Sequence, residues 1–209
     1  MKRLFTPAIL AIGTLMGSMS VANAVQVSIL AMKVTDSTAP TANLNPYLGW
    51  TGAGGHNEGV AGASALMNNG IDYKNSFVDT NWADVLRVRV AMWKGGNEEV
   101  FAEFDATGTT QENFFTQANV LSSSWTDLAG PGNFFSIAGH DAVDRHWFVN
   151  NNYGGCSRDV GHMVVLDRRT SYACSWENSR VGGGSPDRGF LYSTAMTEQN
   201  WNGSNIGIA

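Results

Sequence analysis

Apolar and polar residues alternate in two consecutive runs, residues 86–93 and 100–105. A period of two places every second side chain on the same face of a β-strand, so each run is predicted to be a strand with one buried face. The intervening residues 94–98 have the sequence Lys-Gly-Gly-Asn-Glu, and glycine and asparagine accept the backbone angles of a tight turn. The pattern therefore predicts a β-hairpin.

The register of this hairpin follows from the same pattern. Placing Val90 opposite Ala102 gathers the apolar residues of both strands on one face. A shift by one residue would mix apolar and charged faces, which makes this register the favoured one. We interpret the charges as a solvated face rather than as the carboxylate pair of a glycosidase. The charged pairs that this register predicts are Arg89 with Glu103 and Arg87 with Asp105.

The rest of the chain consists of short β-branched or aromatic runs separated by turn residues, without long apolar stripes at helical spacing. This predicts an all-β fold: a single-domain antiparallel β-sandwich, or a jelly roll, with at most one short helix. We expect that helix within residues 59–69 and a long loop over residues 35–56. Because the sequence ends at Ala209 inside a strand pattern, the domain is expected to be truncated at its C-terminus. Further strands are expected at residues 25–34, 146–149, 162–167, 171–176, 189–193 and 205–209.

The first 24 residues have the pattern of a signal peptide. Lys2 and Arg3 precede an apolar stretch, and small residues at Ala22 and Ala24 stand where a signal peptidase would cleave. A transmembrane helix is less favoured, because the stretch contains Pro and Gly and is shorter than the ~20 residues that a span needs. We predict export by a bacterial cell to a periplasmic or extracellular location. The mature domain would comprise residues 25–209, with no transmembrane segment.

Composition narrows the possible functions. The 209 residues include 13 Lys and Arg against 18 Asp and Glu, a formal net charge of -5, and the basic residues form no cluster. Such a chain lacks the positive surface that nucleic acids or anionic membranes attract, so neither is an expected partner. Seven Trp and ten Phe supply enough apolar surface to build a core, which excludes intrinsic disorder.

Cys156 and Cys174 are the only cysteines. In an exported protein an even number of cysteines predicts a disulfide, here one that ties down the Gly- and Asn-rich residues 150–155. A catalytic thiol with His162 as its base is the alternative. It is less favoured because it leaves the second cysteine without a role.

Ligand-type side chains are densest in residues 139–146. Asp141 and Asp144, together with backbone carbonyls, could bind calcium, which prefers oxygen ligands. The same residues could instead serve as turn or cap residues. Zinc is a further alternative, and it would need His140 and His146 with a further ligand such as His162 or His56.

Several aromatic residues lie beside Asn, Asp or Gly in expected loops. A sugar ring stacks its C–H face on an aromatic plane, while amides satisfy its hydroxyl groups. We expect at least four of the seven Trp residues to be largely buried in the core. The candidate ligand-binding residues are Trp50, Tyr153, Trp201, Asn151 and Asn152.

The favoured function is an exported, non-catalytic binding or adhesion domain that recognises a glycan or another cell-surface component, with calcium as a possible cofactor. Common catalytic signatures such as G-x-S-x-G and H-E-x-x-H are absent from the sequence, so catalysis is not expected. One alternative is a secreted glycan hydrolase or lyase that uses Glu103 or Asp105. Another is a structural protein of the extracellular matrix or envelope, suggested by the abundant Gly and low charge.

Overall fold

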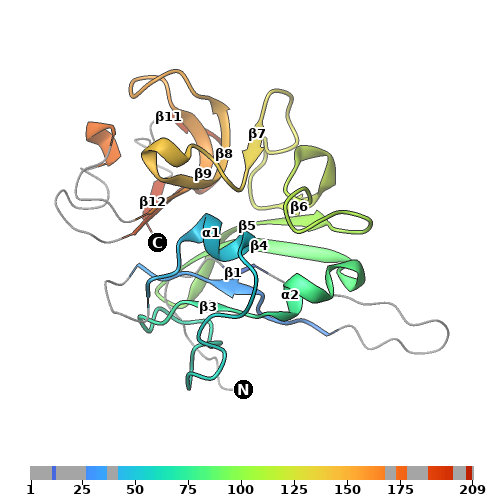
Figure 1. Ribbon diagram of the computed structural model, residues 1–209. Helices are drawn as coiled ribbons and strands as arrows, with labels where there is room; N and C mark the ends of the chain where they lie inside the picture. The colour runs from blue at the N-terminus through green and yellow to red at the C-terminus, as the bar shows by residue number, and fades with distance from the viewer. Residues whose placement is uncertain are drawn as a thin grey trace, which may run out of the picture.

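The computed structural model describes residues 11–12, 27–36, 42–167, 173–177, 188–199 and 206–208. Its regular elements are mostly β-strands in antiparallel sheets, with only a few short helices (Figure 1). The predicted all-β class is therefore confirmed. Within the described residues, no helix is long and apolar enough to cross a membrane.

The first sheet is built around the predicted hairpin. Strand β4 (Arg87–Lys94) pairs with β5 (Asn97–Asp105) in the expected register, with Val90 opposite Ala102, Arg89 opposite Glu103 and Arg87 opposite Asp105. The turn between the strands uses positive φ angles at its two glycines. In spatial order the sheet comprises β3 (Tyr73–Lys74), β2 (Met32–Lys33), β1 (Ala11–Ile12), β4 (Arg87–Lys94), β5 (Asn97–Asp105) and β6 (Val120–Ser123).

Strand β1 comes from the segment that the sequence predicts to be a signal peptide. Ile12 pairs with Met32 of β2 on one side and with Val90 of β4 on the other. Cleavage after Ala24 would remove this strand. The edges of β2 and β4 would then lose the partner that lies between them.

The second sheet is a meander. Strands β7, β8, β9 and β10 are neighbours in the same order as they occur in the chain, and β11 also pairs with β9. These described strands thus lack the Greek-key connection that a jelly roll would require. In spatial order the sheet comprises β12 (Ile206–Ile208), β10 (Gly189–Ser193), β9 (Val160–Leu166), β8 (Arg145–Asn152) and β7 (Phe134–Ser136), with β11 at Glu198–Gln199.

One hydrophobic core joins the two sheets. Side chains of β4 and β5 belong to the same buried cluster as side chains of β8, β9 and β10. Along β8, Trp147 and Val149 belong to this cluster, whereas Phe148 belongs to a smaller one with Trp176. This alternation follows from the period of two of a β-strand. It leaves Phe148 and Asn150 on the face of β8 that is turned away from the main core.

The helices lie elsewhere than the sequence pattern predicted. The expected loop 35–56 contains α1 (Pro46–Thr51), which begins after Asn45, whose side chain accepts hydrogen bonds from the amides of Tyr47 and Leu48. A second helix, α2, spans Phe77–Thr80, so the limit of one helix was wrong. The described residues also contain three short 3-10 turns: Trp82–Asp84, Gln117–Asn119 and Asp141–Val143.

Residues 59–69, where a helix was expected, form turns and bends. These turns surround the buried ammonium of Lys33. Its Nζ donates hydrogen bonds to the carbonyl oxygens of Ala65 and Met67 and to Oδ1 of Asn69. Because burial disfavours the charged form, the pKa of Lys33 falls to about 8. The turn thus satisfies a buried cation with carbonyl groups that a helix would have used internally.

Candidate functional site

A pocket of about 420 Å³ lies against the outward face of β7 and β8. It is within the size range of small-ligand sites in proteins. Its lining comes from β7, from β8 and from the segments that flank β8. The lining residues are Phe134, Gly139, His140, Phe148, Asn150, Asn151 and Tyr153.

Two exposed aromatic rings form walls of this pocket. The side chain of Phe134 is 54% exposed and that of Tyr153 is 42% exposed. Phe134 is paired with Asn150 across β7 and β8, which places both side chains on the same face of the sheet. Buried Phe148 supports Tyr153, since their rings meet edge to face at 5.3 Å between centroids.

Polar groups complete the lining. Asn150 is only 2% exposed, and its Oδ1 has no hydrogen-bond partner within the described part of the chain. The hydroxyl of Tyr153 is hydrogen-bonded to Nδ1 of His140, while Asn151 donates to Asn133 at 3.3 Å. A buried acceptor without a donor costs about 1–3 kcal/mol, so Asn150 is an energetically costly residue to keep at this position.

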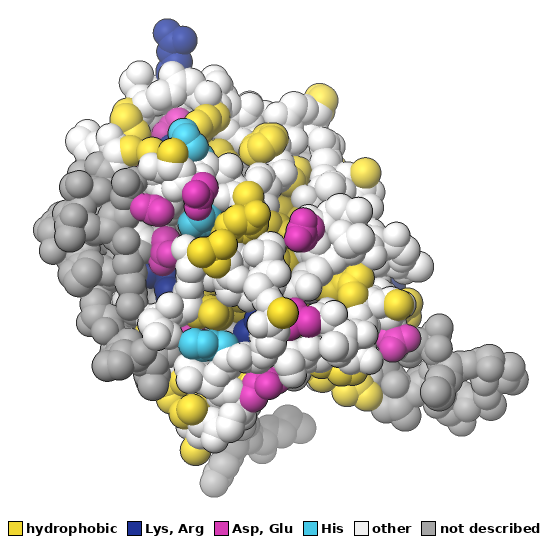
Figure 2. All heavy atoms as spheres, in the orientation of Figure 1, with side chains coloured by type: hydrophobic (Ala, Val, Ile, Leu, Met, Phe, Trp, Pro, Cys, Tyr) yellow, Lys and Arg dark blue, Asp and Glu magenta, His cyan; other side chains and the backbone are white. Residues whose placement is uncertain are grey.

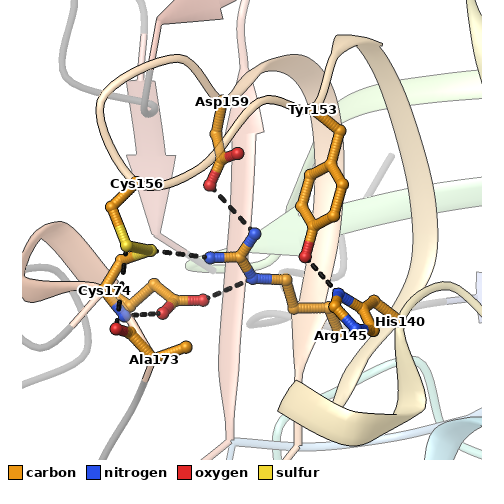
Figure 3. The surroundings of a disulfide bond; sticks show 8 residues. His140, Arg145, Tyr153, Cys156, Asp159, Ala173 and Cys174 are labelled. Atoms are coloured by element: carbon orange, nitrogen blue, oxygen red, sulfur yellow. Dashed lines mark hydrogen bonds and ion pairs between the residues drawn. A yellow bond between two sulfur atoms is a disulfide. The ribbon is translucent and has the colours of Figure 1, made fainter.

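The Tyr153 wall rests on a buried charged cluster (Figure 3). The guanidinium of Arg145 lies 5.3 Å from the ring centroid of Tyr153 and 5.2 Å from that of Trp176. Arg145 donates from Nη1 to Asp159 Oδ2 at 2.9 Å and from Nε to Glu177 Oε1 at 2.7 Å. These contacts hold the cation in a fixed orientation against the ring.

Burial also affects the ionisation of this cluster. It raises the pKa of Tyr153 above its usual value of 10, and the nearby Arg145 offsets this only partly. The phenol therefore stays protonated at neutral pH and keeps its hydroxyl as a donor. Burial likewise raises the pKa of Asp159, with Arg145 acting in the opposite direction.

The predicted disulfide between Cys156 and Cys174 is confirmed. It joins the segment that follows β8 to residues 173–177, which also carry Glu177 and Trp176. The Gly- and Asn-rich residues 150–155 are thereby anchored at their C-terminal end, as expected. The bridge also lies beside the cluster that supports Tyr153 (Figure 3).

Only two of the predicted ligand-binding residues that the structure describes line the pocket. Tyr153 and Asn151 line the pocket together, whereas Asn152 is exposed at the end of β8 and is not part of the lining. Trp50 is fully buried, so its assignment as a binding residue was wrong. Its ring packs edge-on against Trp147, and its Nε1 donates to the backbone of Gln111. Trp201 lies outside the described residues.

Four side chains of this site were not predicted from the sequence to bind a ligand there: Phe134, Phe148, Asn150 and His140. Phe134 belongs to the sequence Asn-Phe-Phe, which also occurs at residues 113–115. There both phenylalanines are buried, while here Phe134 faces solvent. The local sequence is the same, so only the surrounding strands distinguish the two copies.

The predicted calcium ligands lie next to the pocket but outside its lining. Asp141 begins a 3-10 turn, and Asp144 ends it with a left-handed backbone. Among the described residues, no group of three or more His, Cys, Asp and Glu side chains is arranged to hold a metal ion.

The side chains of three of the four histidines considered for zinc have separate partners. His140 contacts Tyr153, His146 contacts the carbonyl of Ala138, and His162 contacts Asp127.

The carboxylates considered for hydrolysis lie on the charged face of the hairpin. Glu103 forms ion pairs with Arg87 at 2.9 Å and with Arg89 at 3.5 Å. Asp105 is exposed and accepts a hydrogen bond from the amide of Thr107, which lowers its pKa. Neither side chain lines the pocket. This arrangement fits the predicted solvated face and offers no cleft between two carboxylates.

A smaller pocket of about 180 Å³ lies at the Gly-rich residues 52–55. Buried Lys74 borders it but is already paired with Asp79 at 2.7 Å. This pocket therefore lacks a free charged group for a ligand.

Comparison with known proteins adds no functional information, because no protein family, no curated protein and no solved structure matches this chain.

Proposed function

We propose that the pocket between Phe134 and Tyr153 binds a carbohydrate and that the protein is a non-catalytic binding domain. The observation that carries this proposal is a pocket lined by two exposed aromatic rings, Phe134 and Tyr153, together with the amide residues Asn150 and Asn151. A sugar presents both complementary features, namely an apolar C–H face for a ring and hydroxyl donors for the amide.

The charge of the lining favours a neutral ligand. It contains no Lys, Arg, Asp or Glu, and Arg145 is not part of it. On the face of the molecule shown in Figure 2, acidic side chains are scattered and basic ones are few. An anionic glycan would find no partner for its charge here, so we propose a neutral glycan.

The proposed location of the protein is outside the cytoplasm. The predicted signal peptide and the disulfide both fit an exported protein, since disulfides persist in oxidising compartments. A glycan of a cell surface is then the proposed partner. We also propose calcium, bound by Asp141 and Asp144, as a cofactor. Its effect on glycan binding is tested by comparing calcium with EDTA.

A glycan array probed with the exported protein tests this proposal, first with calcium and then with EDTA. We expect binding to neutral glycans, and loss of that binding in Phe134→Ala. The control is Leu121→Ala on β6, since Leu121 is 48% exposed but is not part of the pocket lining. Binding that survives Phe134→Ala, or no binding to any neutral glycan, would contradict the proposal. Binding lost in EDTA would assign a role to calcium.

A further inference from the structure

The two sulfur atoms of the disulfide have unequal surroundings. Cys156 is exposed, whereas Cys174 is buried with 4% of its surface accessible. Only the buried sulfur is contacted by the guanidinium of Arg145, whose Nη2 donates to Sγ of Cys174 at 3.2 Å (Figure 3). An external thiol can thus approach the exposed Cys156, whereas the sulfur of Cys174 faces a cationic donor.

This asymmetry matters for thiol–disulfide exchange. The reaction requires an attacking thiolate to reach one sulfur, and it proceeds faster when the other sulfur is stabilised as a departing thiolate. An arginine N–H that donates a hydrogen bond to a sulfur atom stabilises that sulfur as a thiolate. Access therefore favours attack on Cys156, and Arg145 favours the departure of Cys174.

We propose that the Cys156–Cys174 disulfide is a directional exchange site for external thiols of the glutathione class. The external thiolate forms a bond to Sγ of Cys156, the bond between the two cysteines breaks, and its electron pair leaves on Sγ of Cys174. The products are a mixed disulfide on Cys156 and a thiolate on Cys174 beside Arg145. A second external thiolate releases Cys156 as a thiolate and leaves with the first as an oxidised disulfide, so the two electrons come from the external thiols.

The carboxylates around Arg145 occupy its Nη1 and Nε and leave Nη2 to donate to the sulfur of Cys174. Both oxygens of Glu177 are engaged, one by Nε of Arg145 and the other by the backbone amide of Cys174 at 2.6 Å. Asp159 uses only Oδ2, and within the described structure its buried Oδ1 has no partner. Because burial raises the pKa of Asp159, this group takes up a proton more readily when negative charge develops nearby.

Thiol–disulfide exchange at Cys156 would also affect the proposed glycan pocket. Only Gly154 and Gly155 separate Cys156 from Tyr153, the residue that forms one wall. Opening the disulfide would free this glycine-rich link and loosen the wall. This consequence rests on the proposed function, whereas the direction of exchange does not.

The direction of exchange is tested by identifying which cysteine of the full chain carries the mixed disulfide. The oxidised protein is incubated with reduced glutathione, quenched with an alkylating reagent, and digested for mass spectrometry. We expect the glutathione adduct on Cys156 and the alkyl group on Cys174. Adducts mainly on Cys174, on both cysteines equally, or on neither would overturn the proposal. This result requires no variant and no sugar.

The role of Arg145 is tested by the rate of exchange. Arg145→Gln should slow the formation of the adduct by about tenfold or more, because the departing thiolate loses its donor. The matched control is Arg158→Gln, which removes an exposed positive charge from the same segment. Equal slowing in both variants would assign the effect to general attraction of the thiolate and would contradict the role of Arg145. If Arg145→Gln does not fold, adduct mapping on the unaltered chain still decides the proposal.

Hydrogen exchange of residues 151–156 completes the test. These amides should exchange faster in the reduced protein than in the oxidised protein, without any ligand present. A faster rate together with unchanged glycan binding would contradict the proposed pocket but not the exchange site. An unchanged rate of hydrogen exchange would contradict the coupling between the disulfide and the wall of the pocket.

Discussion

Nε2 of His162 lies 2.7 Å from Oδ1 of Asp127, and this contact ties β9 to the segment that follows Trp125. The other oxygen of Asp127 accepts hydrogen bonds from the backbone amide and the hydroxyl of Thr197, both at 3.1 Å. The ring of Trp125 meets the imidazole edge-on at 5.6 Å. A single carboxylate thus connects three segments around a buried histidine.

This arrangement predicts a loss of stability in mild acid. Burial lowers the pKa of His162 below 6.5, and Asp127 offsets that effect only partly. The unfolded chain therefore binds a proton at a higher pH than the folded chain, so the free energy of unfolding should fall as the pH drops below about 6.5. Chemical unfolding between pH 8 and pH 5 measures this dependence. His162→Gln should flatten it, and an equally steep fall in that variant would disprove the assignment.

Phe134→Ala is expected to weaken glycan binding by about tenfold, since it removes an exposed stacking surface of the proposed pocket. Titration calorimetry with a glycan identified on the array measures the change. Leu121→Ala should bind as the unaltered protein does. Similar losses in both variants would indicate a general effect of surface apolar residues rather than stacking.

Asn150→Leu separates function from stability. The leucine removes the buried, unpaired Oδ1, so the free energy of unfolding should rise or change by less than about 1 kcal/mol. Glycan binding should weaken, because a lining amide is replaced by an apolar side chain. Urea denaturation and calorimetry on the same preparation measure both quantities. Destabilisation by several kcal/mol would show that Asn150 has a structural role instead.

The buried ion pair of Arg188 and Asp72 should be critical for folding. Nη1 of Arg188 lies 3.3 Å from Asp72 and also donates to the carbonyl of Thr35. Arg188→Met should cost about 3–5 kcal/mol, since it leaves a buried carboxylate without its counter-ion. The control Arg87→Met removes a half-exposed partner of Glu103 and should cost less than about 1 kcal/mol. Equal losses in urea denaturation would refute this ranking.

The hairpin of β4 and β5 was predictable because its information is local. Alternating side chains define two faces, and the charges of Arg89 and Glu103 agree with the apolar pattern on one register. The disulfide was predictable for a simpler reason, since Cys156 and Cys174 have no other possible partner within the chain.

Helix α1 was not predicted, because its segment is rich in turn residues and these favoured a loop. Asn45 is nevertheless the N-cap of this helix. Asn45 and Pro46 are typical of loops but equally suit the start of a helix, and the choice depends on what the helix can bury. Trp50 shows the same dependence. Its position on α1 directs it into the core against Trp147, which no pattern in the surrounding residues reveals.

The sequence by itself determined the all-β class, the hairpin register and the pairing of the cysteines, because each depends on periodicity or on the number of available partners. It also identified Tyr153 and Asn151 as candidate binding residues from their composition alone. Only the tertiary structure brought Phe134 and Asn150 beside them and left Oδ1 of Asn150 without a donor. The physical reason is that exposure and hydrogen bonding depend on neighbours that are distant in the chain, whereas the alternation of a strand is a property of the strand itself.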